Sequence, residues 1–302
     1  MIQSPLNYTG GKYKLLSQIL QYFPDGINNF IDLFCGGCNV GVNTQATQHL
    51  FVDKCEPLIQ LYKTMQTMGA EEFLRSVETL IEKYSLSNSA LYGYQYYGCN
   101  SSQGLGAYNR ENYNCLKNDF NSLTPTDVMY SPMLYVLIVY SFNNQIRFNS
   151  KGEFNLPVGK RDFNDKMKNK LVNFISQIQH ETFSFVCSDY KNIKTISMHS
   201  NDFVYVDPPY LITCASYNEL GGWTDSDEYE LLGYLDELTA NNIKFALSNV
   251  LESKGEKNII LKEWLDRNHY YTVINLDYSY RNSNYHKLNR EFDTNEILVL
   301  NY

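Results

Sequence analysis

The sequence predicts an α/β protein in which an open, mainly parallel sheet is interrupted by a mainly helical insertion carrying a β-hairpin. Short apolar segments alternate with helical periods along most of the chain, but this alternation stops from about Glu56 to Leu171. Three of the apolar segments carry an acid at or near their end: Asp32, Asp53 and Asp207. The carboxyl ends of parallel strands form the edge at which open α/β sheets bind ligands. The 302 residues allow one large domain with an insertion, or two modest domains.

The N-terminal segment begins with turn-forming residues and continues into a helical period from Tyr13 to Phe23. Gly10 and Gly11 allow the backbone to approach a ligand closely. Lys12 lies at the start of the expected helix, where the helix dipole disfavours a cation. We therefore expect Lys12 to reach an anion such as a carboxylate.

A short strand from Phe30 to Phe34 is followed by the glycine loop Cys35-Gly36-Gly37-Cys38. A strand, a glycine loop and then a helix are typical of a nucleotide-binding βα unit, although the G-x-G-x-x-G spacing is absent. The next strand, His49 to Val52, ends at Asp53, which is 21 residues after Asp32. An acid at this distance usually binds ribose hydroxyls, so we predict a ligand with an adenosine-like ribose and no pyrophosphate.

The insertion is expected to contain helices from Leu58 to Tyr84, a buried element from Met133 to Ser141 and a hairpin from Asn143 to Gly159 that turns at Ser150-Lys151-Gly152. The hairpin carries amides and an arginine, which can hydrogen-bond base edges. From Arg147 to Lys170, seven basic and three acidic residues give a charge of +4, whereas the remainder of the chain carries −12. A basic patch on an acidic body is compatible with DNA binding. Charge alone is more typical of a solvated helix face.

The second half of the chain predicts the return of the sheet. Strands are expected at Thr182–Val186, Phe203–Val206 and Ile243–Leu247, a helix at Asp225–Ala240, and a final antiparallel pair at Tyr271–Leu276 and Glu296–Tyr302. The loop from Leu211 to Trp223 is a candidate lid. A second basic edge contains Arg281, His286, Lys287 and Arg290.

The strand Phe203 to Val206 runs directly into Asp207-Pro208-Pro209-Tyr210. Prolines lack the amide hydrogen and fix φ, so the chain must leave the sheet in a stiff turn. The Asp207 carboxylate and the Pro208 carbonyl can each accept one N–H, and the Tyr210 ring can stack. This set suits a planar base with an exocyclic amine, although an aspartate here can also simply cap a helix.

The composition indicates the cellular location of the protein and the kinds of site that it can contain. The seven cysteines are odd in number and scattered, which favours a reducing, cytoplasmic location over a disulfide scaffold. Cys35 and Cys38 have zinc-like spacing, but no second Cys or His pair accompanies them, so we expect no metal. No secretory signal is visible, and the longest apolar run, Met133 to Tyr140, is too short to span a bilayer.

With these residues considered together, the chain resembles the Dam-type (alpha class) N6-adenine DNA methyltransferases from end to end. Four motifs carry the resemblance in the family's order: the cofactor motif Asn7–Lys12, the glycine motif Asp32–Gly37 with Asp53 as the ribose acid, the target-recognition hairpin Asn143–Gly159, and the catalytic motif Asp207–Tyr210. The resemblance implies a Rossmann-like, S-adenosylmethionine-dependent methyltransferase sheet. It places the catalytic domain at residues 1–58 and 172–302, and the target-recognition insertion at residues 59–171.

The resemblance also implies a role for individual residues. The catalytic residues would be Asp207, Pro208, Pro209 and Tyr210, acting on a flipped adenine without a metal. S-adenosylmethionine would be contacted by Tyr8, Gly11, Lys12, Asp32, Phe34, Gly36, Asp53, Asp189, Tyr190 and Asp207, with Lys12 on its methionine carboxylate. Double-stranded DNA would be bound by Asn143, Gln145, Arg147, Asn149, Lys151, Pro157, Lys160 and Arg161, with Arg147 on a guanine edge.

Some residues depart from the family pattern and leave alternatives open. Cys38 stands where the family usually has a second glycine, and Asn7 and Gln145 differ from members that read GATC. The target is therefore GATC or a related short palindrome such as CATG, in a restriction-modification system with a separate endonuclease or in a phage or orphan enzyme. A methyltransferase for RNA adenine or glutamine usually has Asn at the position of Asp207. A catalytically silent DNA-binding regulator is expected to have lost Asp207, Tyr210 or Lys12.

Overall fold

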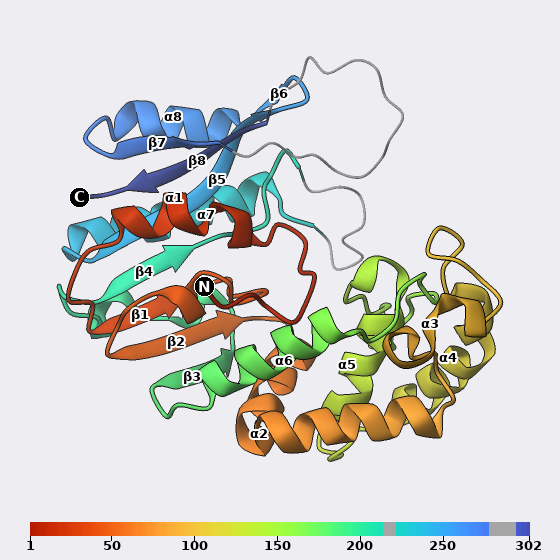
Figure 1. Cartoon of the computed structure of the whole chain (residues 1–302). Coiled ribbons are helices and arrows are strands. Elements are labelled where there is room, and N and C mark those ends of the chain that lie inside the picture. The colour runs from red at the N-terminus through yellow and green to blue at the C-terminus, as the bar shows by residue number, and fades with distance from the viewer. Residues whose placement is uncertain (214–221, 278–293) are drawn as a thin grey trace. The chain divides into compact units, whose positions relative to one another are not determined.

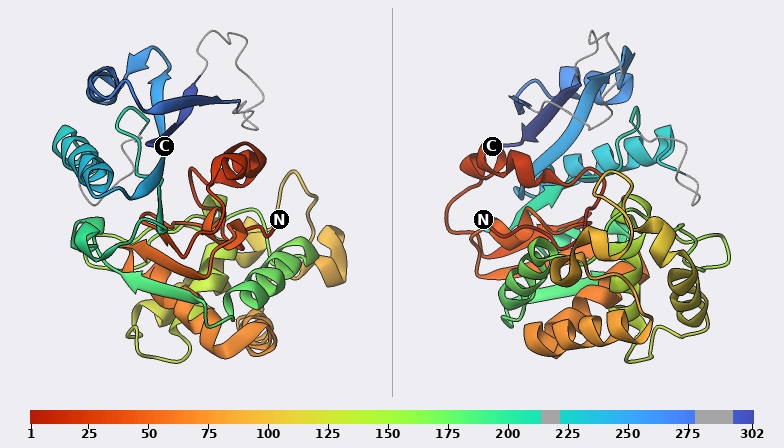
Figure 2. Two further views of the ribbon diagram at one scale, coloured as in Figure 1. Left: turned by 90° about the vertical axis from the view of Figure 1, so that its left-hand side faces the viewer. Right: turned by 45° about the vertical axis from the view of Figure 1, so that its right-hand side comes forward.

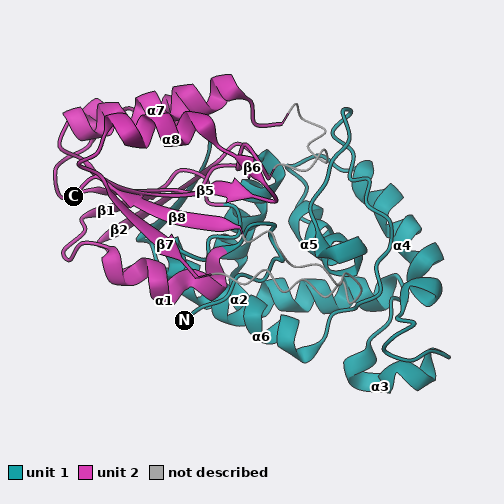
Figure 3. Cartoon of the chain, turned by 90° about the horizontal axis from the view of Figure 1, so that it is seen from above, with its two compact units in different colours: residues 1–11, 36–43, 55–187 teal, residues 12–35, 44–54, 188–302 magenta. Residues whose placement is uncertain are grey.

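The computed structural model describes residues 1–213, 222–277 and 294–302 (Figure 1). The central part of the candidate lid and the second basic edge at residues 281–290 lie outside the described residues. The chain divides into two compact units (Figure 3). Unit 1 comprises residues 1–11, 36–43 and 55–187, and unit 2 comprises residues 12–35, 44–54 and 188–302.

Unit 2 contains a mixed sheet whose described strands follow the order β2-β1-β4-β5-β8-β7. The first four are parallel, and β8 and β7 are antiparallel additions beside β5. Their bounds are β2 Gln48–Asp53, β1 Asn29–Asp32, β4 Phe203–Val206, β5 Lys244–Ser253, β8 Asn295–Leu300 and β7 Thr272–Leu276, and the short β6, Glu256–Lys257, pairs with β5. The mainly parallel sheet and the final antiparallel pair are as the sequence predicts.

Helices cover both faces of this sheet. Helices α7 (Asp225–Ala240) and α8 (Ile259–Arg267) lie on one face, and α1 (Leu16–Ile19) lies on the other (Figures 2 and 3). Successive side chains of β4 point to opposite faces of the sheet, and all four are buried. Both faces of this strand must therefore be covered. Val204 and Val206 join the core formed with α7 and α8, whereas the Phe203 ring lies 4.7 Å from that of Phe23, which follows α1. The sheet is therefore the middle layer of unit 2.

Unit 1 is mainly helical. It contains α2 (Glu56–Lys83), α3 (Ser89–Tyr96), α4 (Gly106–Asn121), α5 (Tyr130–Tyr140), α6 (Asp165–Ile178) and the strand β3 (Phe183–Cys187). Every residue of α5 is buried, and α5 packs against α2 and α4. This helix is the buried element that the sequence predicts from Met133 to Ser141.

The expected hairpin from Asn143 to Gly159 folds back on itself but forms no continuous strands. Isolated antiparallel bridges join Phe148 to Phe154 and Ser141 to Val158. The turn lies at residues 149–152, where the Gly152 N–H donates to the Asn149 carbonyl over 2.9 Å. The position of the turn is as predicted.

Three local predictions are wrong. The glycine loop leads to a 3-10 turn, Gly41–Asn43, because asparagine side chains bind its backbone: Asn43 Nδ2 donates to the Asn39 carbonyl over 2.8 Å. The expected helix from Tyr13 to Phe23 is instead a four-residue α-helix between two 3-10 segments. Strand β5 continues to Ser253, beyond the expected end at Leu247, because β8 pairs along it. Within the described ranges, no helix is both long and apolar enough to cross a bilayer.

Candidate active site

The Asp207 turn lies where the order of the parallel strands reverses. Strand β1 is flanked by β2 and β4, so the connections from it leave in opposite directions. Asp32 at the end of β1 pairs in register with Tyr205, two residues before Asp207. Open α/β sheets bind ligands at such a reversal, outside the carboxyl ends of the strands. The sheet thus places Asp32 and the Asp207 motif at the edge that the sequence predicts.

Four side chains of unit 2 form a buried cluster around Asp207. Lys12 Nζ lies 2.8 Å from Asp207 Oδ1 and 3.5 Å from Glu296 Oε1. The Tyr210 hydroxyl lies 2.9 Å from the same Asp207 oxygen, to which it donates, and 3.3 Å from Glu296 Oε1. Lys12 Nζ also lies 4.9 Å from the centre of the Tyr210 ring. The Lys12 and Glu296 side chains are 3% and 1% exposed, against 18% for Asp207, so Asp207 is the member of the cluster that solvent or a ligand can reach.

Asp32 adds a further carboxylate to this region. Its pKa is raised well above its usual value, first by burial and then by the charges of Asp207 and Asp53, although the Phe34 N–H and Lys12 oppose the shift. Its Oδ1 is buried and has no hydrogen-bond partner among the residues that the structure describes. An unsatisfied buried oxygen is costly in a folded protein. Among the described side chains of this region, carboxylates outnumber ammonium groups, which favours a ligand that carries positive charge.

Aromatic side chains lie together at the end of β1. The Phe34 ring is 5.3 Å from the Tyr190 ring and 5.8 Å from the Trp223 ring. The Tyr190 hydroxyl is buried and without a hydrogen-bond partner among the described residues. Asp189 accepts a hydrogen bond from the Lys191 N–H over 3.0 Å, which fixes the turn that carries Tyr190. Phe34 and Tyr190, both predicted from the sequence, are thus brought together.

In unit 1, the glycine loop receives the ring of Tyr8. A β carbon on Gly36 would lie 2.8 Å from Tyr8 Cε1, and φ of Gly36 is +43°, so no other residue fits there without a shift. The Gly36 carbonyl accepts a hydrogen bond from the Tyr62 hydroxyl over 2.6 Å, and the Gly11 N–H donates to the Tyr8 carbonyl over 3.1 Å. Cys38 has φ of +57°, a conformation that glycine adopts more readily than other residues.

The predicted DNA-binding residues have different surroundings in unit 1. Arg147 Nε donates to Asn155 Oδ1 over 2.7 Å, which fixes the guanidinium. Asn149 Oδ1 accepts from the N–H groups of Lys151 and Glu153, each over 3.0 Å, so this side chain supports the turn. The remaining predicted side chains are at least partly exposed, namely Asn143, Gln145, Lys151, Pro157, Lys160 and Arg161.

Glu296 was not predicted as a site residue. Strand β8 lies between β5 and β7 and is buried from Glu296 to Leu300. An acid is rarely buried in a strand unless it is paired, and it is this burial, visible only in the structure, that identifies Glu296 as a site residue. Among the described residues, no cluster of three or more His, Cys, Asp or Glu side chains is arranged to hold a metal ion.

Comparison with known proteins agrees with this geometry. Residues 8–282 match the family described as D12 class N6 adenine-specific DNA methyltransferase. The chain is 39% identical to the Type II methyltransferase M.FokI of Planomicrobium okeanokoites and 37% identical to the modification methylase StsI of Streptococcus sanguinis, over its full length in both cases. It spans 43% of the length of each of these relatives.

A more distant relative is similar in length to the chain. The DNA adenine methylase of Escherichia coli K12 is 24% identical over 87% of the chain and 84% of its own length. The family match extends over most of the chain, through both the glycine loop and the Asp207 motif. The chain therefore belongs to the D12 class of N6 adenine-specific DNA methyltransferases.

Proposed function

We propose that the chain transfers a methyl group from S-adenosylmethionine to N6 of a flipped adenine in a short duplex DNA sequence. The observation that carries the proposal is the buried cluster in which Lys12 and Tyr210 hold Asp207 at the carboxyl end of β4. Family membership supports the reaction class. Relatives named as modification methylases and as DNA adenine methylase support DNA as the substrate and a restriction-modification role.

The contacts of Asp207 support separate tasks for its two oxygens. Lys12 and Tyr210 both bind Oδ1, which leaves Oδ2 to accept an N–H of the adenine amine. The Pro208 carbonyl accepts the second N–H. The lone pair of this amine is delocalised into the ring, and accepting both hydrogens favours the pyramidal nitrogen of the transition state. Acceptors that are held in place before the reaction supply such stabilisation without reorganisation.

The residues around Asp207 fit S-adenosylmethionine. This cofactor would supply an electrophilic methyl group on a positively charged sulfur. The surplus of buried carboxylates, including Asp32 with its unpartnered oxygen, suits that charge. Lys12 would bind the methionine carboxylate and Asp53 the ribose. The further residues proposed to contact it are Tyr8, Gly11, Phe34, Gly36, Asp189, Tyr190 and Asp207.

For DNA, the proposal assigns target recognition to the insertion at residues 59–171. A base inside a duplex cannot present its amine to Asp207, so the adenine must leave the stack. Tyr210 would then stack on the flipped base. Arg147, oriented by Asn155, would bind a guanine edge. The proposed target is GATC or a related short palindrome such as CATG, and the proposed partner in the cell is a separate endonuclease.

The variant Asp207→Ala tests the proposed chemistry. We expect it to lose methyl transfer, because the amine loses its acceptor, while duplex binding stays within a few-fold of wild type. Transfer of labelled methyl groups and fluorescence anisotropy of a labelled duplex measure the two properties. Near-normal turnover by this variant would contradict the assignment of Asp207.

A further inference from the structure

A basic pocket lies in unit 1 beside the start of α6. It has a volume of about 410 Å³ and is lined by three cationic side chains and three amides: Arg161, Lys166, Lys170, Asn7, Asn144 and Asn164. None of the described residues that line it carries a carboxylate. We call it the basic pocket.

The three cations of the basic pocket have no acidic partners in the described part of the chain. None of them forms a salt bridge with a described residue. Lys170 is partly buried, and this burial, together with the charge of Lys166, lowers the pKa of Lys170. The cations therefore repel one another, and an anion in the pocket would relieve both the repulsion and the desolvation.

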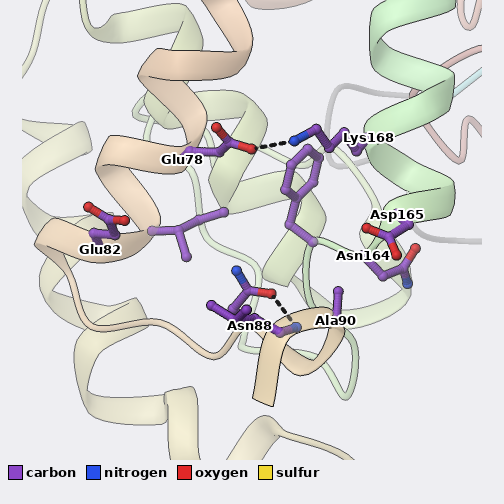
Figure 4. Close-up of a pocket in the computed structure, with 10 residues that line it drawn as sticks. Glu78, Glu82, Asn88, Ala90, Asn164, Asp165 and Lys168 are labelled. Atoms are coloured by element: carbon purple, nitrogen blue, oxygen red, sulfur yellow. Dashed lines mark hydrogen bonds and ion pairs between the residues drawn. The ribbon is translucent and has the colours of Figure 1, made fainter. Parts of the chain in front are cut away.

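Lys168, between these two lysines on α6, has a different environment (Figure 4). Its Nζ lies 2.8 Å from Glu78 Oε1, and a separate pocket of about 340 Å³ contains both side chains together with Glu82 and Asp165. The lysines of α6 therefore have two kinds of surroundings. Lys168 lies beside acidic side chains that neutralise its charge, whereas Lys166 and Lys170 line the basic pocket. A uniformly solvated basic helix would not show this division.

The basic pocket adjoins the segment that is proposed to read bases. Asn7 Nδ2 donates to Asn144 Oδ1 over 3.3 Å. Asn144 Nδ2 in turn donates to the Val139 carbonyl at the end of α5. Asn143 and Asn144 both have positive φ, +57° and +53°, so these side-chain bonds hold a backbone that is otherwise disfavoured. The pocket is therefore fixed to the start of the predicted recognition hairpin.

We propose that the basic pocket binds a phosphodiester group of the DNA backbone through Arg161, Lys166 and Lys170. This inference rests on the proposed function and adds a binding site to it. Guanidinium and ammonium groups form strong, charge-assisted hydrogen bonds with phosphate oxygens. Phosphate contacts fix the register of a protein on the duplex, whereas base contacts specify the sequence. A phosphate held here would position the hairpin for base reading.

The test compares Lys166→Ala and Lys170→Ala with the matched control Lys168→Ala. All three variants remove one positive charge from α6, but the control removes a lysine that is already paired with Glu78. Affinity is measured from 50 to 200 mM NaCl for two labelled duplexes. One carries the sequence that the enzyme is found to methylate, and the other carries a scrambled sequence. For each pocket variant we expect the slope of log K against log salt to decrease in magnitude by about 0.9. The affinity losses should match on the two duplexes, and the control should retain the wild-type slope.

Each outcome of this test has a distinct meaning. If wild type binds the duplex and the pocket variants keep its slope, the pocket assignment is wrong and the proposed function stands. A loss confined to the target duplex would instead indicate base reading and would also overturn the assignment. Inorganic phosphate could raise the unfolding temperature of wild type while the pocket variants keep the wild-type slope of log K against log salt. In that case the pocket binds free anions only, and the assignment to DNA phosphate is wrong. If wild type binds no DNA, both the proposed function and this inference fail.

Discussion

Replacing Lys12 by Met should destabilise the folded protein in the absence of any ligand. Met has a similar length but no charge, so Asp207 and Glu296 would remain buried without the cation that lies 2.8 and 3.5 Å from them. Removing one partner of a buried ion pair costs about 3–5 kcal/mol, because the other charge stays desolvated. Asp207 is 18% exposed and retains some hydration, so we expect about 3 kcal/mol. Urea unfolding at pH 7.5 measures the difference.

The double variant Lys12→Met/Glu296→Gln provides the control. It removes one of the two carboxylates and should recover part of the lost stability, so the two substitutions are expected not to be additive. A deficit below about 1 kcal/mol at pH 7.5, or a double variant that is no more stable than Lys12→Met, would refute the reasoning.

Three further predictions concern other side chains. Burial and nearby carboxylates raise the pKa of Asp32, and a cationic ligand favours its ionised form. Binding of S-adenosylmethionine should therefore strengthen as the pH rises, and it should release protons. Calorimetry in two buffers of different ionisation enthalpy measures both effects, and Asp32→Asn should abolish them. Asn155→Ala removes the acceptor of Arg147 and should reduce discrimination between target and single-base variants by about 1–3 kcal/mol in competition binding. Glu228→Leu should cost about 3 kcal/mol in urea unfolding, since it leaves three buried donors unpaired, from Trp223, Asn249 and Asn258.

Much of unit 2 could be predicted because its signals are local. The bounds of β4 and α7 are as predicted, since a strand bounded by prolines and a helix with a Thr224–Asp227 capping box are marked in the sequence itself. The positions of Asp32 and Asp207 at one edge followed from the rule for parallel strands.

The rest of the site depends on contacts between distant segments. Glu296 meets Lys12 across 284 positions of the sequence, and no local pattern indicates that partner. The alternation rule did not apply either, because β8 is buried on both faces. In the same way, α4 has many asparagines, which disfavour helices, but the burial of Tyr113, Leu116 and Phe120 stabilises it. Tertiary packing decided these features.

The central claim is that this chain methylates adenine N6 in one short DNA sequence. The most direct measurement is transfer of labelled methyl groups from S-adenosylmethionine to unmethylated genomic DNA, followed by mapping of the modified bases. The proposed function predicts N6-methyladenine within a single short motif for wild type and none for Asp207→Ala. Methylation of cytosine, or no incorporation into DNA by a protein that binds S-adenosylmethionine, would contradict it.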